Sequence, residues 1–143
     1  MIRKADRTDA VCMAEMAVMM WDGSVEELAR EFESEIENEE CIFYIYFSDK
    51  MPIGFAQCGL RHDYVEGTES SPVGYLEGIF IREGYRKAGC AKELLAECEN
   101  WAKQKGCSEF ASDCELKNER SLHFHRKVGF TEANRIICFT KQL

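Results

Sequence analysis

The sequence predicts a mixed α/β fold, and two observations favour it. The first is an apolar strand at residues 74–82, followed by a turn of small residues and an amphipathic helix that reaches residue 102. The second is the order of expected elements along the 143 residues, which reads β-α-α-β-β-β-α-β-α-β. Hairpin strands come first and crossover helices later, which is typical of a mixed sheet flanked by helices.

The N-terminal half supplies a strand, two helices and a hairpin. We expect a short strand at residues 2–4 and helices at residues 8–20 and 24–37. Ser24 is followed three residues later by Glu27, which is the spacing of a capping box and marks the start of the second helix. Residues 41–47 and 51–61 then predict strands joined by a polar turn, and residues 62–71 predict a polar loop.

The C-terminal half alternates strands and helices. Apolar residues recur along one face of the helix after the small-residue turn, at Ala91, Leu94, Leu95, Cys98, Trp101 and Ala102. Residues 109–112 predict a short strand, and residues 118–127 predict a helix that Gly129 stops. Residues 131–140 predict terminal strand structure, whose apolar part at Ile136 to Phe139 suits either a core strand or pairing across subunits.

Composition favours one domain over residues 1–143, because a chain with 45% hydrophobic residues can bury one sizeable core and shows no internal linker. No apolar run approaches the length of a membrane span, and the N-terminus lacks a signal-peptide pattern, so we expect a cytoplasmic protein with no membrane partner. The eight cysteines form no CxxC pair, and we expect reduced core residues and no metal.

The net charge of −8 argues against a nucleic-acid partner, for which a basic surface is needed. The same charge suits a cationic small molecule, although acidic chains are also common because charge keeps proteins in solution. Charge therefore excludes one class of partner more firmly than it selects another.

The turn after the apolar strand has the features of a phosphate-binding loop. Small residues let a ligand approach the backbone, and the first N–H groups of the following helix have no partner within it. The loop contains neither GxGxxG nor GKS/T, which excludes the usual dinucleotide and nucleoside triphosphate loops. Packing at a helix start is the alternative interpretation of the same residues, which are Arg86, Lys87, Ala88, Gly89, Cys90 and Ala91.

The pattern Arg86-x-x-Gly89-x-Ala91 after a strand resembles the acyl-CoA pyrophosphate loop of the GNAT acetyltransferase superfamily. Three longer segments resemble the bacterial aminoglycoside 6′-N-acetyltransferases of type I: RHDYVEGTESSPVGYLEGIF, GCSEFASDCELKNERS and GFTEANRIICFTK. The N-terminal third resembles them less. This resemblance implies a GNAT fold, transfer of an acetyl group from acetyl-CoA to the 6′-amine of an aminoglycoside, antibiotic resistance, and a homodimer.

The resemblance also implies how acetyl-CoA is held. The backbone of Ile79, Phe80 and Ile81 would pair with the pantetheine arm, and the loop 86–91 would hold the pyrophosphate. Asn118 matches an asparagine that contacts acetyl-CoA in the family, although an asparagine there also suits a helix cap.

Two residues are candidates for proton transfer. An ammonium cannot attack a thioester, so a base must take its proton, and Glu77 is the acidic residue within the apolar strand. An acid on an exposed face of the strand is the alternative for Glu77. His125 lies where many superfamily members have a tyrosine general acid, and a histidine could protonate the departing thiolate. A surface or packed histidine is the alternative.

The resemblance assigns substrate contacts to Trp21, Ser24, Tyr64, Glu77, Asp113 and Asn134. Helix-end packing is the alternative for Trp21, and a helix cap or loop acid is the alternative for Asp113. Ser24 and Asn134 depart from the family pattern, since some relatives have histidine and an acid there. Two other functions therefore stay open: acetylation of another small amine, such as a polyamine or amino sugar, and a non-enzymatic acyl-CoA-binding module.

Overall fold

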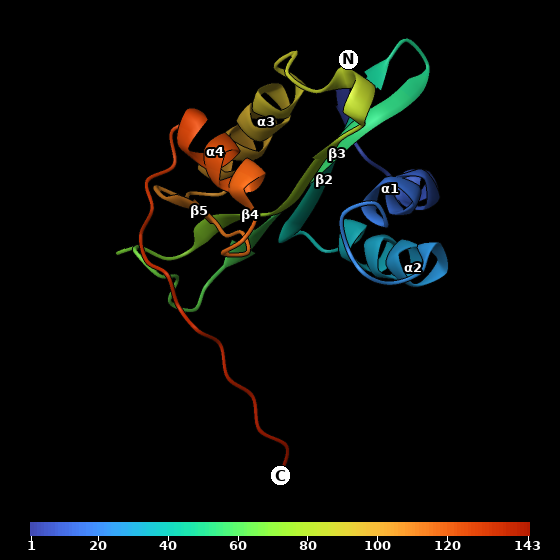
Figure 1. Ribbon diagram of the computed structural model, residues 1–143. Helices are drawn as coiled ribbons and strands as arrows, with labels where there is room; N and C mark the ends of the chain where they lie inside the picture. Colours follow the sequence, from blue (N-terminus) through green and yellow to red (C-terminus); the bar gives the residue numbers. More distant parts are fainter.

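The computed structural model describes all of residues 1–143 and contains one five-stranded sheet (Figure 1). The strands follow in sheet order as β1 (Ile2–Lys4), β2 (Cys41–Ser48), β3 (Met51–Arg61), β4 (Val73–Ile81) and β5 (Phe110–Ser112). Successive strands from β1 to β4 are antiparallel to one another, and β5 is parallel to β4. The parallel step needs a crossover, which the helix between these two strands provides.

Helices cover both faces of the sheet. The first face carries α1 (Ala10–Ala17) and α2 (Val25–Ile36), and the other carries α3 (Cys90–Gln104) and α4 (Glu119–Lys127), as Figure 1 shows. Short 3₁₀ turns, Arg7–Asp9 and Glu83–Tyr85, precede α1 and follow β4. This arrangement confirms the predicted mixed α/β class.

Each face of the sheet has its own apolar cluster. Under α1 and α2, aromatic residues of strands and helix meet, including Phe32, Phe43 and Phe55. Under α3, Leu94 and Leu95 pack on small and apolar strand residues. The buried face of α3 matches the predicted one except that Cys90 is buried and Ala91 is only half-buried.

Most predicted elements appear with bounds shifted by one or two residues, but α1 is shorter than expected. Asp6 caps a 3₁₀ turn by accepting a hydrogen bond from the Thr8 amide, so the α-helix begins only at Ala10. It ends at Ala17, and tighter turns follow that bring Trp21 against Phe32 and Phe55. Packing of the Trp21 ring therefore competes with continuation of the helix.

The prediction of a terminal strand at residues 131–140 is wrong for the single chain. Residues 131–143 have no regular secondary structure and run away from the sheet (Figure 1). Their apolar side chains face solvent, with Ile136, Ile137 and Phe139 exposed by 69%, 79% and 87%. A strand needs a neighbour for its backbone hydrogen bonds, and this segment has none within its own chain.

Two other expectations can be compared with the structure. Four cysteines are buried, but Cys138 is exposed on the terminal segment, so its assignment to the core is wrong. None of the helices is both long enough and apolar enough to cross a membrane.

Candidate active site

Glu77 owes its orientation to an irregularity in β4. Gln57 of β3 pairs with Gly78, but the next residue, Cys58, pairs with Leu76, so Glu77 has no partner in the ladder. One extra residue on one strand is a β-bulge, which re-aims side chains. The Glu77 carboxylate thereby emerges on the sheet face that α1 and α2 cover only in part.

The Glu77 carboxylate forms an ion pair with the guanidinium group of Arg61. The Arg61 Nη2 atom lies 3.0 Å from each carboxylate oxygen of Glu77. The same guanidinium stacks on the Tyr75 ring, with its carbon 3.5 Å from the ring centroid. The Arg61 guanidinium is therefore held between an acid and an aromatic ring.

Asp113 joins this group from the end of β5. Its carboxylate accepts a hydrogen bond from the Tyr75 hydroxyl. Burial, and next this hydrogen bond to Asp113, raise the pKa of Tyr75 well above its ordinary value. Tyr75 therefore stays protonated and fixes Asp113 beside Glu77 and Arg61, so the structure brings together two of the predicted acids.

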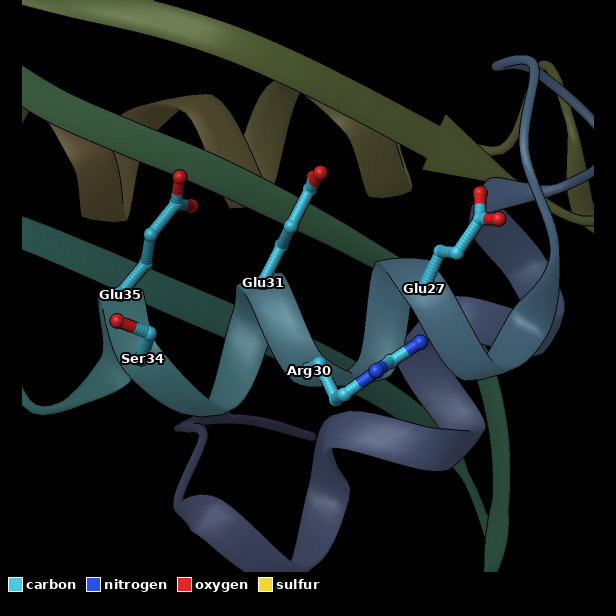
Figure 2. A pocket seen from close by; sticks show the side chains of 5 residues that line it. All are labelled: Glu27, Arg30, Glu31, Ser34 and Glu35. Atoms are coloured by element: carbon cyan, nitrogen blue, oxygen red, sulfur yellow. The ribbon is translucent and has the colours of Figure 1, made fainter.

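A groove of about 510 Å³ runs along α2 and is lined by Glu27, Arg30, Glu31, Ser34 and Glu35. Figure 2 shows the carboxylates of Glu27, Glu31 and Glu35 projecting in parallel from one face of the helix. Glu35 reaches the sheet, where it accepts a hydrogen bond from the Gln57 side chain. Burial raises the pKa of Glu35, and the charges of Glu31 and Glu77 raise it further.

Trp21 closes the apolar end of this face. Its ring packs edge-on against Phe32 and Phe55, with centroid distances of 6.3 and 6.2 Å. It also lies directly over Gly78, because a Cβ atom there would come within 2.2 Å of the ring. The ring is half-buried, so one part packs in the core and another part stays exposed to solvent.

The loop before α3 offers a row of free donors. The backbone N–H groups of residues 87–92 donate no hydrogen bond within the protein; the first such bond of this region runs from Glu93 to the Gly89 carbonyl. Gly89 has a φ of +86°, which an L residue rarely adopts. Six successive free N–H groups at a helix start fit a pyrophosphate group.

One edge of β4 beyond Leu76 has no neighbouring strand. The short strand β5 pairs only with Gly74, Tyr75 and Leu76. Residues 77–81 therefore keep unpaired backbone groups on that side, next to the 86–91 loop. An extended amide-containing arm could add to this edge as a strand would.

His125 lies on α4 and contacts Ser112 at the end of β5, next to Leu76 of β4. Its Nδ1 atom lies 2.7 Å from the Ser121 carbonyl oxygen, so Nδ1 carries a proton and donates it there. Its Nε2 atom lies 2.8 Å from the Ser112 hydroxyl, which is 3.2 Å from the Leu76 carbonyl oxygen. One hydroxyl proton cannot serve both partners, so Nε2 is an acceptor or a donor depending on where Ser112 points.

The other predicted site residues lie apart from this group or have a structural partner. Ser24 caps α2 by accepting a hydrogen bond from the Glu27 amide, and Asn118 caps α4 in the same way through Ser121. Tyr64 is exposed on the loop after β3, and Asn134 lies on the terminal segment, where it donates to Glu66.

Sequence reasoning missed Arg61, Tyr75, Gln57 and Glu35. Gln57 carried a visible sign, because it is a polar residue inside the apolar strand IGFAQCGL. The others depend on which residues face each other across the bulge. No set of three or more His, Cys, Asp or Glu side chains is arranged to hold a metal ion.

Comparison with known proteins gives a consistent result along the whole chain. Residues 9–130 match the acetyltransferase (GNAT) family. The chain is 36% identical over 142 residues to an aminoglycoside N(6′)-acetyltransferase type 1 of Stenotrophomonas maltophilia, covering 99% of this chain and 93% of that protein. It is also 36% identical to the Salmonella typhimurium protein of the same name, covering 99% and 98%.

Solved structures of the same group of enzymes are similar to the chain over its whole length. An aminoglycoside 6′-N-acetyltransferase from Acinetobacter haemolyticus, in apo form, superposes with a TM-score of 0.96 at 34% identity and covers 100% of this chain and 99% of that one. The enzyme AAC(6′)-Iy, bound to the bisubstrate analogue CoA-S-monomethyl-acetylneamine, superposes with a TM-score of 0.94 at 35% identity, covering 100% and 98%. The chain therefore belongs to the acetyltransferase (GNAT) family, in the group of the type 1 aminoglycoside N(6′)-acetyltransferases.

Proposed function

We propose that the protein transfers the acetyl group of acetyl-CoA to the 6′-amino group of aminoglycoside antibiotics and thereby gives resistance to them. The observation that supports this most is the full-length similarity to AAC(6′)-Iy bound to an analogue that joins CoA to an acetylated aminoglycoside fragment. The net charge of −8 and the acids around Glu77 suit a substrate with several ammonium groups.

Acetyl-CoA supplies an activated acetyl group as a thioester. The free N–H groups of residues 87–92, with Arg86 beside them, suit its pyrophosphate. The unpaired edge of β4 at Ile79, Phe80 and Ile81 suits the amides of its pantetheine arm. Asn118 lies at the start of α4 and completes the predicted contacts.

Glu77 takes the proton of the substrate amine, directly or through a water molecule. Its exposure and its place in the bulge support this role, because a base must reach the amine that attacks. Asp113 holds the same ammonium in position by its charge, and Tyr75, whose ring is covered by the Arg61 guanidinium, fixes the Asp113 carboxylate through its hydroxyl. Positioning of this kind supplies much of the rate of a two-substrate reaction.

His125 returns a proton to the departing thiolate. The contact between Nε2 and the Ser112 hydroxyl supports this role, because an imidazolium at His125 can give its Nε2 proton to Ser112 while Ser112 gives its own hydroxyl proton to the thiolate; the neutral ring is then reprotonated from solvent. Trp21 and Tyr64 provide ring faces for the sugar, and Ser24 and Asn134 are the two predicted contacts at which this chain departs from its family.

The protein works as a homodimer in which each subunit receives the terminal segment of its partner. Residues 131–143 present three large apolar side chains to solvent. On the same side of the molecule, α4 has no buried residue, and Phe124, Val128 and Phe130 are only partly covered. A strand contributed by a second copy would cover these groups and use the open side of β5.

Turnover tests the proposal directly. The purified protein is incubated with acetyl-CoA and kanamycin or tobramycin, and release of the CoA thiol is followed with a thiol reagent. We expect turnover, and we expect a host carrying the gene to grow in kanamycin where its parent does not. Absence of turnover with every 6′-amino aminoglycoside would exclude the proposal. Activity with spermidine or glucosamine would then favour another small amine, and no acetylation of any amine would favour an acyl-CoA-binding module.

A further inference from the structure

Glu35 is a half-buried carboxylate of α2 that has no cationic partner. Its one hydrogen-bond partner is the neutral amide of Gln57. No lysine or arginine forms an ion pair with it, and the charged groups that face it are the acids Glu31 and Glu77. A carboxylate withdrawn from water without a counter-charge costs folding free energy.

Gln57 fixes this carboxylate from the sheet. Gln57 is only 8% exposed, and its side-chain Nε2 donates a hydrogen bond to the Glu35 carboxylate. Its side-chain oxygen accepts no hydrogen bond within the protein. Since no fully buried side-chain oxygen or nitrogen lacks a partner, this oxygen keeps some contact with solvent. A nearly buried amide thus offers one free acceptor beside the Glu35 carboxylate.

The position of Gln57 links this pair to the reaction centre. Gln57 pairs with Gly78 at the bulge that exposes Glu77. Glu77 and Glu35 lie close enough for the charge of one to act on the other. The contrast between them is informative, because Glu77 holds the Arg61 guanidinium whereas Glu35 holds no cation.

We propose that Glu35, held in place by Gln57, binds a second ammonium group of the substrate while Glu77 receives the amine that is acetylated. This proposal rests on the proposed function and adds to it a recognition rule: the enzyme selects molecules with at least two amino groups. The carboxylate of Glu35 and the free oxygen of Gln57 together accept the hydrogen bonds of that ammonium. Substrate binding thereby provides the counter-charge that the folded chain lacks.

Steady-state kinetics of Glu35→Gln test this rule, because the change removes one charge and keeps the shape and the contact with Gln57. We expect the KM for kanamycin B to rise about tenfold, with kcat within about twofold of wild type, since the second ammonium is bound equally before and during the reaction. Glu39→Gln is the matched control, because Glu39 is an exposed acid outside the groove and its loss changes net charge equally. We expect its KM to stay at the wild-type value.

A monoamine gives the decisive comparison. Methyl 6-amino-6-deoxyglucoside has the reacting amine and no other, so its inhibition constant against kanamycin B should be the same for wild type and Glu35→Gln. A KM for kanamycin B that does not rise, or an inhibition constant that rises by the same factor, would overturn the proposal. Lack of turnover by the wild type itself would instead reject the proposed function, so the two failures are distinguishable.

Gln57→Met provides a second route to the same answer. It keeps the Glu35 charge and removes the amide that positions it, so we expect the KM for kanamycin B to rise about threefold with an unchanged inhibition constant for the monoamine. Circular dichroism melting of each variant shows whether it is folded at the assay temperature. A Gln57→Met enzyme that is folded and has wild-type KM would count against the positioning role.

Discussion

At the scale of single residues, the site is a small set of charges placed around one irregular point of β4. Glu77 emerges there because it has no partner in β3, and Arg61 and Tyr75 reach it from the same sheet face. Three of the site's charged or aromatic residues therefore depend on the pairing register, which composition and spacing do not reveal.

Glu77→Gln tests the assignment of the base. We expect kcat for kanamycin to fall about 100-fold, because general-base assistance contributes on the order of 10²–10⁴ in rate. The KM for acetyl-CoA should not change, since the pyrophosphate loop is untouched. Stopped-time product analysis at several pH values is the measurement, with Glu39→Gln as the control. Turnover within twofold of wild type across the pH range would remove Glu77 from the reaction.

Gly78→Ala tests the packing of Trp21 on the bulge. A Cβ atom at Gly78 would lie 2.2 Å from the Trp21 ring, so the ring must move. We expect the free energy of unfolding in urea to fall by about 1–3 kcal/mol, which is typical of an overfilled core. Gly84→Ala is the control, because nothing lies within 4 Å of the position its Cβ would take. Equal stabilities of the two variants would contradict the packing.

Glu35 makes stability depend on pH in a definite direction. Its pKa is raised above 4.5, so the folded chain holds a proton on Glu35 at pH values where the unfolded chain has lost it. Ionisation of Glu35 therefore weakens folding. We expect Glu35→Gln to have a higher melting temperature than wild type at pH 7, and this gain should vanish as the pH falls below 4.5. A variant less stable than wild type at pH 7 would show that the carboxylate is not strained.

At the scale of elements, local patterns predicted those segments whose structure is set by their own residues. The capping box at Ser24, the hairpin at residues 41–61 and the apolar face of α3 all appear. The predicted α1 was too long, because the last residues turn to seat the Trp21 ring in a core that only the tertiary fold creates. Residues 131–140 have a strand pattern but no partner strand within the chain.

The candidate site was predictable to a similar extent. The loop 86–91 was located from small residues after a strand, and the structure adds six free N–H groups at residues 87–92. Glu77 and Asp113 were located from single acids beside strands, and the stacked pair of Arg61 and Tyr75 links them, since Arg61 bonds to Glu77 and Tyr75 to Asp113. Tyr64 and Asn134 came from resemblance alone, and their part in substrate binding stays a prediction.

Ser24→Ala tests how much the cap contributes to α2. The Ser24 hydroxyl accepts a hydrogen bond from the Glu27 amide at 3.1 Å, and the Glu27 carboxylate accepts one from the Ser24 amide. We expect the change to lower the free energy of unfolding by about 1 kcal/mol, whereas Ser24→Asp keeps a capping oxygen and should stay close to wild type. Chemical denaturation of the three proteins decides it, and an alanine variant as stable as wild type would show that the cap contributes nothing.

At the scale of the whole molecule, one sheet supports two apolar clusters and the cofactor loop, which favours the prediction of a single domain over residues 1–143. The terminal segment is the exception, because nothing in its own chain covers it. The exposed isoleucine and phenylalanine side chains at residues 136–139 are the observation on which the proposed dimer rests.

Exchange of the terminal segment predicts a dimer that one charge can disrupt. We expect light scattering to give twice the 16.5 kDa of the chain for the wild type and a shift toward 16.5 kDa for Ile137→Lys, because lysine would lie in the new interface. Val11→Lys is the control, since Val11 is exposed on α1, on the opposite side of the sheet. A wild-type monomer, or a dimer that Ile137→Lys leaves intact, would contradict the exchange.

The bulge at Glu77 also bears on how this protein can change over generations. Removing the codon for this one amino acid would leave the paired stretches 54–61 of β3 and 73–81 of β4 in an unbroken ladder. The shortened chain would be the more regular sheet, and it would lack the acid on which the proposed chemistry depends. If Glu77 is the base, deletion of this residue would therefore impair catalysis while leaving a regular sheet.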